Sequence, residues 1–278
     1  MGAVEPARPR GRRPDAWTSD RAYEPFIGRW SRAVAPQFLR WLPPAGPSAW
    51  CDVGCGTGAL AHAVAAVADP ALLVGFDRSA AYLAAARRHA PGGRLAVAVG
   101  GATALPVRDG RFDRVVSALV LNFVPRPADA VAEMRRITRP GGVVAGYVWD
   151  YGGGMQLLRT FWDAATALDP AAADLDEVRR FPLCRPGPLH DLFAGAGLSD
   201  VDVMAIDVPT VFTGFDDLWL PFLGGQGPAA GYCAALPEDR RVALREDLRA
   251  RLPHRPDGTI PLTARAWAVR GRAASPTR

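Results

Sequence analysis

A glycine-rich turn constrains the fold of this chain more than any other feature of its sequence. The turn reads Asp52-Val53-Gly54-Cys55-Gly56-Thr57-Gly58, and it lies between a short apolar run and an alanine-rich segment. This order predicts a strand, a tight turn and a helix. Glycine lets a ligand approach the main chain without meeting a Cβ atom, and the first amides of the helix can face that ligand. We therefore expect a nucleotide-binding turn in which Gly54, Cys55 and Gly56 contact the ligand.

Two classes of cofactor use turns of this kind. Gly54, Gly56 and Ala59 satisfy the dinucleotide fingerprint G-x-G-x-x-G/A, so the turn alone is compatible with NAD. It is also compatible with S-adenosylmethionine, and a glycine loop that binds nothing is a third interpretation. The choice among the three depends on the rest of the chain.

Strand-like and helix-like segments alternate after residue 47. The expected strands are residues 48–53, 72–76, 95–99, 112–120 and 143–149, and the expected helices between them are residues 59–67, 79–90 and 127–139. Such alternation predicts an α/β fold with a doubly wound, parallel sheet. In this fold, ligands bind at the carboxyl ends of the strands, where the strand order reverses. Asp77 follows the second strand, and a carboxylate there can accept hydrogen bonds from both hydroxyls of a ribose.

The basic side chains exclude several kinds of enzyme. All 33 residues of the lysine and arginine class are arginines. The absence of lysine excludes P-loop NTPases, Schiff-base chemistry and dehydrogenases of the Tyr/Lys type. The four cysteines have neither C-x-x-C spacing nor a nearby histidine, so we expect no metal site. Cys51 and Cys55 are interpreted as packing residues, with a thiol nucleophile at Cys55 as the alternative.

The formal net charge of +5 is concentrated near the two ends of the chain. We interpret residues 1–15 and 273–278 as disordered tails, with contact to RNA or to an acidic partner as the alternative role of the arginine-rich first tail. Between them no basic stripe is interleaved with aromatic residues, so nucleic acid is not an expected partner. Neither a bilayer-spanning run nor a signal peptide is visible, which favours a soluble, cytoplasmic protein without a membrane partner. The oligomeric state stays open.

Five short motifs follow one another between Asp52 and Gly142. They are D-V-G-C-G-T-G at 52–58, G-F-D at 75–77, A-x-A-L-P-V-x-D-G-x-F-D at 102–113, V-V-S-A-L-V-L at 115–121 and R-P-G-G at 139–142. In combination they resemble class I S-adenosylmethionine-dependent methyltransferases, in the branch of ubiquinone/menaquinone-type and natural-product small-molecule enzymes. A dehydrogenase would share only the first two motifs, so the resemblance favours S-adenosylmethionine over NAD.

The resemblance implies a Rossmann-like sheet of seven strands, mostly parallel, with an antiparallel last strand. The last two strands would be residues 201–211 and 261–270. We expect a methyltransferase domain over residues 48–272, with cap insertions near 151–186 and 212–258. Aromatic residues at helical spacing in residues 16–47 predict lid helices, with the Tyr23 hydroxyl available to the cofactor, although such aromatics can also serve only to pack. The aromatic residues of the insertions are more typical of a core than of a ligand cage; they are Phe161, Trp162, Phe215, Trp219 and Phe222.

The resemblance also implies a set of cofactor contacts. Gly54 and Gly56 would border the methionine end of S-adenosylmethionine, and Asp77 would bind its ribose. The residues expected around the adenine are Arg78, Gly101, Ala102, Thr103 and, through its backbone carbonyl, Leu119. Gly101 departs from the family pattern, because many relatives have an acid there that accepts a hydrogen bond from the adenine amine. We expect a substitute acceptor or weaker binding; one lost hydrogen bond is worth about 0.5–1.5 kcal/mol.

Methyl transfer from a sulfonium needs mainly alignment and exclusion of water, because the methyl group is already activated. A carbon or oxygen acceptor also needs a base near the ends of the fourth and fifth strands. Asp150 and Tyr151 follow the fifth strand and are candidates for that role, although Asp150 can instead cap the next turn. Asn122, after the fourth strand, could orient the acceptor. No D/N-P-P-Y/F motif is present, which argues against methylation of the amino groups of nucleic acid bases.

The sequence therefore predicts transfer of a methyl group from S-adenosylmethionine to an O, N or C atom of a small molecule, in specialised or quinone-like metabolism. S-adenosylhomocysteine would be the product. Two alternatives stay open. One is a methyltransferase acting on RNA or protein, and the other is a cofactor-binding module without catalysis.

Overall fold

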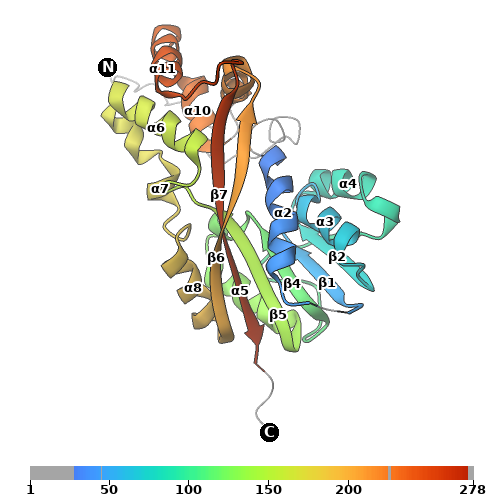
Figure 1. The fold of residues 1–278 in the computed structure, drawn as a ribbon. Helices are drawn as coiled ribbons and strands as arrows, with labels where there is room; N and C mark the ends of the chain where they lie inside the picture. The colour runs from blue at the N-terminus through green and yellow to red at the C-terminus, as the bar shows by residue number, and fades with distance from the viewer. Residues whose placement is uncertain (1–27, 45, 225–226, 275–278) are drawn as a thin grey trace, which may run out of the picture.

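A computed structural model describes residues 28–44, 46–224 and 227–274 of the chain (Figure 1). The proposed tail 1–15, residues 16–27 of the expected lid and the Tyr23 side chain therefore lie outside the described residues, as do residues 275–278.

Seven strands form one sheet in the order β3-β2-β1-β4-β5-β7-β6. They are β1 (Ala49–Val53), β2 (Leu72–Asp77), β3 (Ala96–Val99), β4 (Phe112–Ala118), β5 (Thr138–Trp149), β6 (Leu198–Phe212) and β7 (Ile260–Ala273). The strands β1 to β5 pair in parallel, whereas β7 is antiparallel to both β5 and β6. The predicted seven-stranded, doubly wound sheet with an antiparallel last strand is confirmed.

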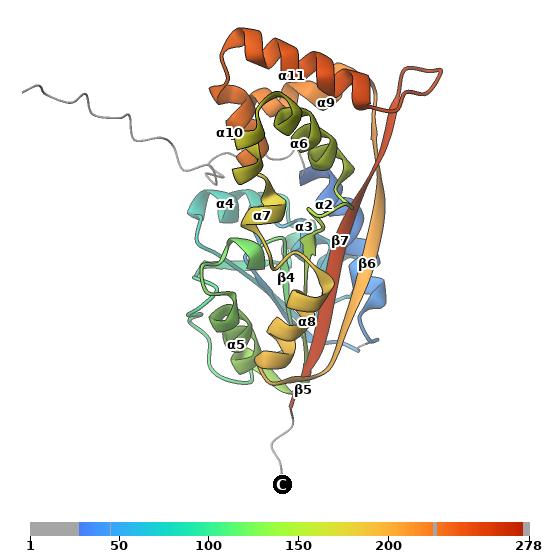
Figure 2. The same cartoon turned by 90° about the vertical axis from the view of Figure 1, so that its left-hand side faces the viewer.

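Helices connect the parallel strands and cover both faces of the sheet (Figure 2). The connecting helices are α3 (Ala59–Val67), α4 (Ala80–Arg88) and α5 (Pro127–Ile137), with the short turns η2 (Pro91–Gly93) and η3 (Leu121–Phe123). All of β1 is buried, as expected for a central strand covered on both faces. The strand order reverses between β1 and β4, so the ligand crevice belongs at the carboxyl ends of these two strands.

Several helix and strand boundaries in the structure differ from the predicted ones. The strand predicted at 112–120 ends at Ala118, because Leu119 turns to a positive φ of 58°. The helix predicted at 127–139 ends at Ile137, and β5 begins directly after it at Thr138. The last strand extends to Ala273, which is buried, so the prediction that the C-terminal tail begins at residue 273 was wrong by at least this residue.

The last two strands are longer than the others, with 15 residues in β6 and 14 in β7, and they rise beyond the sheet as a two-stranded arm (Figures 1 and 2). Most of the remaining helices gather around this arm and form the cap of the molecule. These elements are α6 (Gln156–Leu168), η4 (Pro170–Asp174), α7 (Glu177–Arg180), α9 (Phe215–Trp219), η5 (Leu220–Gly224), α10 (Gly227–Ala235) and α11 (Glu238–Arg251). Helix α8 (Pro186–Gly195) packs lower down, against β6 and α5.

Aromatic side chains fill the interior of the cap. The rings of Phe161 and Phe222 stack with centroids 4.5 Å apart, and the ring centroids of Trp162 and Tyr232 are 5.7 Å apart. Phe215 and Trp219 also stack on each other, at 6.2 Å. This mutual packing is that of a core, which agrees with the interpretation of these aromatics as packing residues.

Helix α2 (Arg29–Trp41) joins the sheet to the cap. Its buried Phe38 contacts the ring of Tyr147 on β5, with centroids 5.1 Å apart. At its first turn, Arg29 forms a 2.9 Å ion pair with Asp217 of α9. The described part of the predicted lid is therefore a helix that fixes the cap relative to the sheet. No helix among the described residues has the length and apolar character needed to cross a membrane.

Polar contacts of Arg159 and Glu177 hold the first part of the cap together. Arg159 of α6 pairs with Asp176 at 2.6 Å and also donates to the Tyr151 carbonyl oxygen at 3.4 Å. Nearby, the Trp162 indole donates to the carboxylate of Glu177, whose side chain is buried. Burial raises the pKa of Glu177 from 4.5 to about 7, so this carboxylate gains a proton more readily in the folded protein than in the unfolded chain.

We expect Glu177→Gln to stabilise the protein at pH 8. Because the folded-state pKa lies above the unfolded value, the stability of the wild type falls as the pH rises from about 4.5 to about 7. The substitution keeps an oxygen for the Trp162 indole and removes the buried charge, so the free energy of unfolding should rise by up to about 3 kcal/mol at pH 8 and much less at pH 5. Denaturant unfolding at both pH values measures this, with Glu246→Gln on α11 as an exposed control. A loss of stability at pH 8 would contradict the prediction.

Candidate active site

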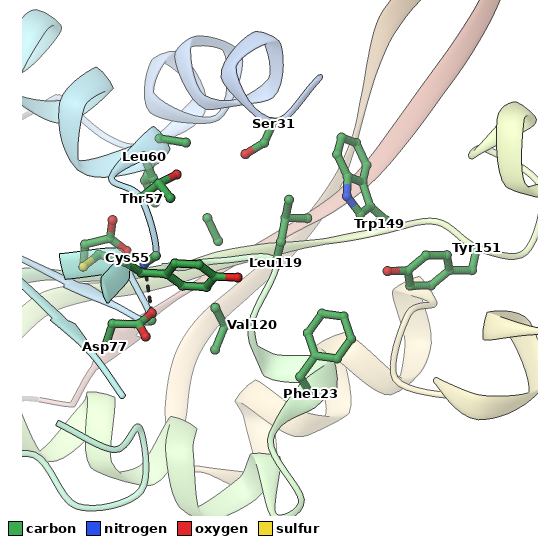
Figure 3. Close-up of a pocket in the computed structure, with 16 residues that line it drawn as sticks. Ser31, Cys55, Thr57, Leu60, Asp77, Leu119, Val120, Phe123, Trp149 and Tyr151 are labelled. Atoms are coloured by element: carbon green, nitrogen blue, oxygen red, sulfur yellow. Dashed lines mark hydrogen bonds between the residues drawn. The ribbon is translucent and has the colours of Figure 1, made fainter. Parts of the chain in front are cut away.

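A cavity opens at the carboxyl ends of β1, β2, β4 and β5, where the strand order reverses (Figure 3). It is lined by residues of five segments of the chain. They are Ser31; Asp52, Gly54, Cys55, Gly56, Thr57, Ala59 and Leu60; Asp77 and Tyr82; Ala118, Leu119, Val120 and Phe123; and Trp149 and Tyr151. The structure thus brings together six of the residues singled out from the sequence, which are Gly54, Cys55, Gly56, Asp77, Leu119 and Tyr151.

The glycine turn forms one wall of this cavity. Gly54 has a φ of 74°, and a Cβ atom there would lie 2.5 Å from Cγ2 of Val120, so only glycine fits without displacement. The amides of Gly54 and Cys55 both donate to the Phe76 carbonyl oxygen, at 2.7 and 3.0 Å. These two hydrogen bonds tie the turn to β2. Cys55 packs against Gly75, and burial raises the pKa of its thiol, which leaves it inert.

Asp77 connects the turn to the end of β2. One carboxylate oxygen accepts from the Gly56 amide at 2.9 Å, and the other accepts from the Ser79 amide at 2.8 Å. Each carboxylate oxygen can accept a second hydrogen bond, so Asp77 can hold the turn and contact a ligand hydroxyl at the same time.

Asp52 is a polar group of the site that the motif analysis did not single out. Its side chain is only 1% exposed and lines the cavity, and neither carboxylate oxygen makes a hydrogen bond of ordinary geometry within the described part of the chain. Burial raises its pKa from 3.8 to about 7; the Ala61 amide opposes the shift, and the charge of Asp77 adds to it. The available signal in the sequence was an acid inside an otherwise apolar strand.

Leu119 holds an unusual backbone conformation beside the turn. Its φ is 58°, which is uncommon for a residue with a side chain, and its amide donates to the Tyr147 carbonyl oxygen at 2.8 Å. Such conformations occur preferentially at functional sites. Here it ends β4 early and turns the segment from Leu119 to Phe123 along the cavity wall.

The half of the cavity farther from the glycine turn is aromatic and uncharged. Figure 3 shows Phe123, Trp149 and Tyr151 around this half, with the Tyr151 hydroxyl pointing into it and Ser31 of α2 above. Phe181 supports two of the rings from behind, with centroids 5.1 Å from Phe123 and 5.6 Å from Tyr151. Among the described lining residues, the only charged side chains are Asp52 and Asp77, at the other end.

Several predicted site residues lie elsewhere. The two carboxylate oxygens of Asp150 accept from the amides of Gly152 and Gly154, at 3.0 and 3.1 Å, so its side chain caps the turn after β5 and does not line the cavity. Asn122 lies on η3 and is not a lining residue. The residues predicted around the adenine, apart from Leu119, lie outside the cavity wall; they are Arg78, which is exposed, and Gly101, Ala102 and Thr103 in a turn after β3.

Comparison with known proteins agrees with this geometry. Residues 51–146, which run from β1 into β5, match the family described as a methyltransferase domain. They form a class I S-adenosylmethionine-dependent methyltransferase domain. The predicted recognition of the family is confirmed, and the match supports S-adenosylmethionine as the cofactor of this domain.

The relatives of the chain include enzymes named for quinone biosynthesis. The chain is 38% identical over 108 residues to the ubiquinone/menaquinone biosynthesis C-methyltransferase of Paracoccus denitrificans, a stretch covering 37% of this chain and 43% of the relative. It is 34% identical over 134 residues to the ubiquinone biosynthesis O-methyltransferase of Thiobacillus denitrificans, covering 46% and 55%. The matched region therefore spans about half the length of these relatives.

Solved structures share the fold over more of the chain. Phosphoethanolamine N-methyltransferase 2 of Haemonchus contortus, solved with phosphomonomethylethanolamine and S-adenosylhomocysteine, superposes with a TM-score of 0.54 over 90% of this chain and 56% of that one. The identity is 19%, so the similarity concerns the fold alone.

We expect Gly101→Asp to strengthen binding of S-adenosylmethionine. A Cβ atom at Gly101 would meet nothing within 4 Å, so the turn after β3 can accept an aspartate side chain. One added hydrogen bond to the adenine amine, worth about 0.5–1.5 kcal/mol, corresponds to an affinity gain of about 2- to 13-fold. Isothermal titration calorimetry measures the change. Gly153→Asp, which is also unobstructed, is the matched control, and equal affinities of the two variants would contradict the prediction.

Proposed function

We propose that this protein transfers a methyl group from S-adenosylmethionine to a small, largely apolar acceptor and releases S-adenosylhomocysteine. The observation that carries the proposal is a single cavity with two unlike halves. One half contains the glycine turn and two carboxylates, and the other is aromatic and uncharged among the described residues. Such a cavity suits a charged cofactor beside an apolar second ligand.

The carboxylates suit the chemistry of the cofactor. S-adenosylmethionine carries positive charges on its amino group and its sulfur atom, and Asp52 is a carboxylate without a compensating partner in the described structure. A cation beside Asp52 would stabilise its charged form. We assign the ribose to Asp77, because its two oxygens already fix the position of the turn and can each accept one more hydrogen bond.

The aromatic half would hold the acceptor against the methyl group. Alignment of the two reactants supplies much of the rate gain in such a transfer, roughly 7–11 kcal/mol, and exclusion of water strengthens every polar contact. Tyr151 is the predicted catalytic residue that the geometry favours, because its hydroxyl faces this half. Asp150 retains a supporting role, since the turn that it caps begins with Tyr151.

We infer that the acceptor is a free small molecule and not a nucleic acid, because the described lining residues include no cation to contact phosphate. The relatives methylate carbon in one case and oxygen in the other, so either atom fits the proposal. We also propose a cytoplasmic location, where the four buried free cysteines would stay reduced.

We expect Asp52→Asn to stabilise the protein without cofactor and to weaken cofactor binding. The pKa of Asp52 rises from 3.8 to about 7 on folding, so stability falls as the pH rises through this range. At pH 8 the charged form is destabilising by up to about 4 kcal/mol, and asparagine removes that charge. The same change removes the partner of the cofactor cations, so affinity for S-adenosylmethionine should fall about 10-fold or more.

Denaturant unfolding and calorimetric titration, both at pH 8, measure the two effects. Asp191→Asn, on an exposed side chain of α8, is the control and should change neither. The wild-type affinity should also weaken as the pH falls from 8 to 6, because Asp52 takes up a proton. Unchanged affinity of Asp52→Asn would show that this carboxylate does not face the cofactor.

The proposed function is tested by transfer of a labelled methyl group from S-adenosylmethionine into a host extract. The extract is then separated into small-molecule, nucleic-acid and protein fractions. We expect label in the small-molecule fraction for the wild type and for Asp191→Ala, and none for Asp77→Ala. Asp77→Ala removes hydrogen bonds to a charged group, which are worth about 1.5–3 kcal/mol of binding free energy. The affinity of this variant for the cofactor should therefore fall roughly 10- to 150-fold. Label in the nucleic-acid or protein fraction alone would contradict the proposal.

A further inference from the structure

An unpaired indole lies in the aromatic half of the cavity. Trp149 ends β5, is 1% exposed, and lines the cavity, yet its Nε1–H has no hydrogen-bond partner among the described residues. Figure 3 shows this nitrogen on the ring edge directed toward the space between Leu119, Phe123 and Tyr151. Buried polar groups are nearly always paired, so an unpaired one in a cavity points to a group that a ligand completes.

Two other indoles of the chain do have hydrogen-bond partners. Trp50 donates to the Ser48 hydroxyl at 2.9 Å, and Trp162 donates to Glu177. The Trp30 nitrogen also has no partner within the described part of the chain, but Trp30 packs against Phe212 and does not line the cavity. Trp149 therefore combines an unpaired donor with a place in the wall of the site.

The backbone holds Trp149 in this place. It pairs with Ala266 of β7, and the next amide, that of Asp150, donates to the Arg265 carbonyl oxygen at 2.8 Å. An indole on a strand that is hydrogen-bonded up to its end cannot easily turn away to find a partner elsewhere. The donor is thus presented in a fixed direction, as specificity requires.

We propose that Trp149 selects the acceptor by donating a hydrogen bond to an oxygen atom on it. The proposal rests on the function proposed above and specifies the class of acceptor: an aromatic or alicyclic molecule with a carbonyl or phenolic oxygen. An indole can only donate, so it rejects a protonated amine and gains nothing from a hydrocarbon. The Tyr151 hydroxyl points into the same half of the cavity, so it can act on the same oxygen or on its neighbour.

Discrimination of this kind is strong in principle. A site built to bond a ligand oxygen disfavours the analogue that lacks it, because its own buried donor is then left unpaired. Trp149 is a specificity-determining residue in this proposal, and alignment of the acceptor with the methyl group follows from the same contact.

The test uses two probes that differ at one ring position, where 1-tetralone has a carbonyl group and tetralin has a methylene group. Each is titrated into the full chain saturated with S-adenosylhomocysteine. We expect the wild type to bind 1-tetralone at least 10-fold more tightly than tetralin. Trp149→Phe should lose this preference and bind tetralin within about 3-fold of the wild type. Trp30→Phe, which removes the unpaired indole outside the cavity, is the matched control and should keep the preference.

A spectroscopic readout on the wild type makes the test independent of the stability of the variants. In protein labelled with ¹⁵N-tryptophan, the Nε1–H signal of Trp149 is assigned by its absence in Trp149→Phe. A hydrogen bond should move this signal downfield with 1-tetralone and leave it in place with tetralin. Equal binding of the probes with no movement of the signal would overturn the proposal for Trp149 alone. Failure of both probes to bind would count against the acceptor half itself, and failure of the proposed function would appear separately, as absence of labelled product.

Discussion

The site depends on the carboxylate of Asp77, which joins the second strand to the glycine turn that follows the first. Its two oxygens accept from Gly56 and Ser79, and the Phe76 carbonyl oxygen beside it accepts from the turn as well. These contacts fix the turn at the place where the strand order reverses. Val120 packs so close to Gly54 that a Cβ atom there would lie 2.5 Å from it, so the position of the turn also affects the segment after β4. A substitution at Asp77 is therefore expected to displace residues on both sides of the crevice.

The second constraint is the arm formed by β6 and β7. Antiparallel pairing is continuous from Asp202 to Phe212 of β6, from the sheet up to the cap, so the cap is held by backbone hydrogen bonds. Helix α2 also connects the sheet and the cap, because Phe38 contacts the sheet and Arg29 forms an ion pair with the cap. Transfer of a methyl group requires exclusion of water from the aromatic half of the cavity, and a wall fixed in this way suits that requirement.

The succession of strands and helices along the chain, the glycine turn and the position of Asp77 at the end of the second strand were all predictable, because each depends on residues that are close in sequence or on a pattern shared by a whole fold class. Side-chain direction was harder to predict. Asp150 and Tyr151 are neighbours at a strand end, where successive side chains point opposite ways, and only the structure shows that Tyr151 enters the cavity while Asp150 caps a turn. The expected adenine contacts at Gly101 to Thr103 follow the edge strand β3 and do not line the cavity, although the neighbouring Gly100 amide donates to the carbonyl oxygen of Asp77.

The two unpaired polar residues of the cavity were beyond prediction for another reason. Whether Asp52 and Trp149 have partners depends on every segment that packs around them. Burial disfavours the charged form of Asp52, and the Trp149 indole has no hydrogen-bond partner among the described residues, so both residues lower the stability of the protein without ligands. They differ in the ligand that would correct this, a cation for the acid and an oxygen for the indole. Among the described residues, the cavity therefore has an unpaired acceptor, Asp52, at one end and an unpaired donor, the Trp149 indole, at the other. Such a cavity is suited to two different ligands bound side by side, as a transfer reaction requires.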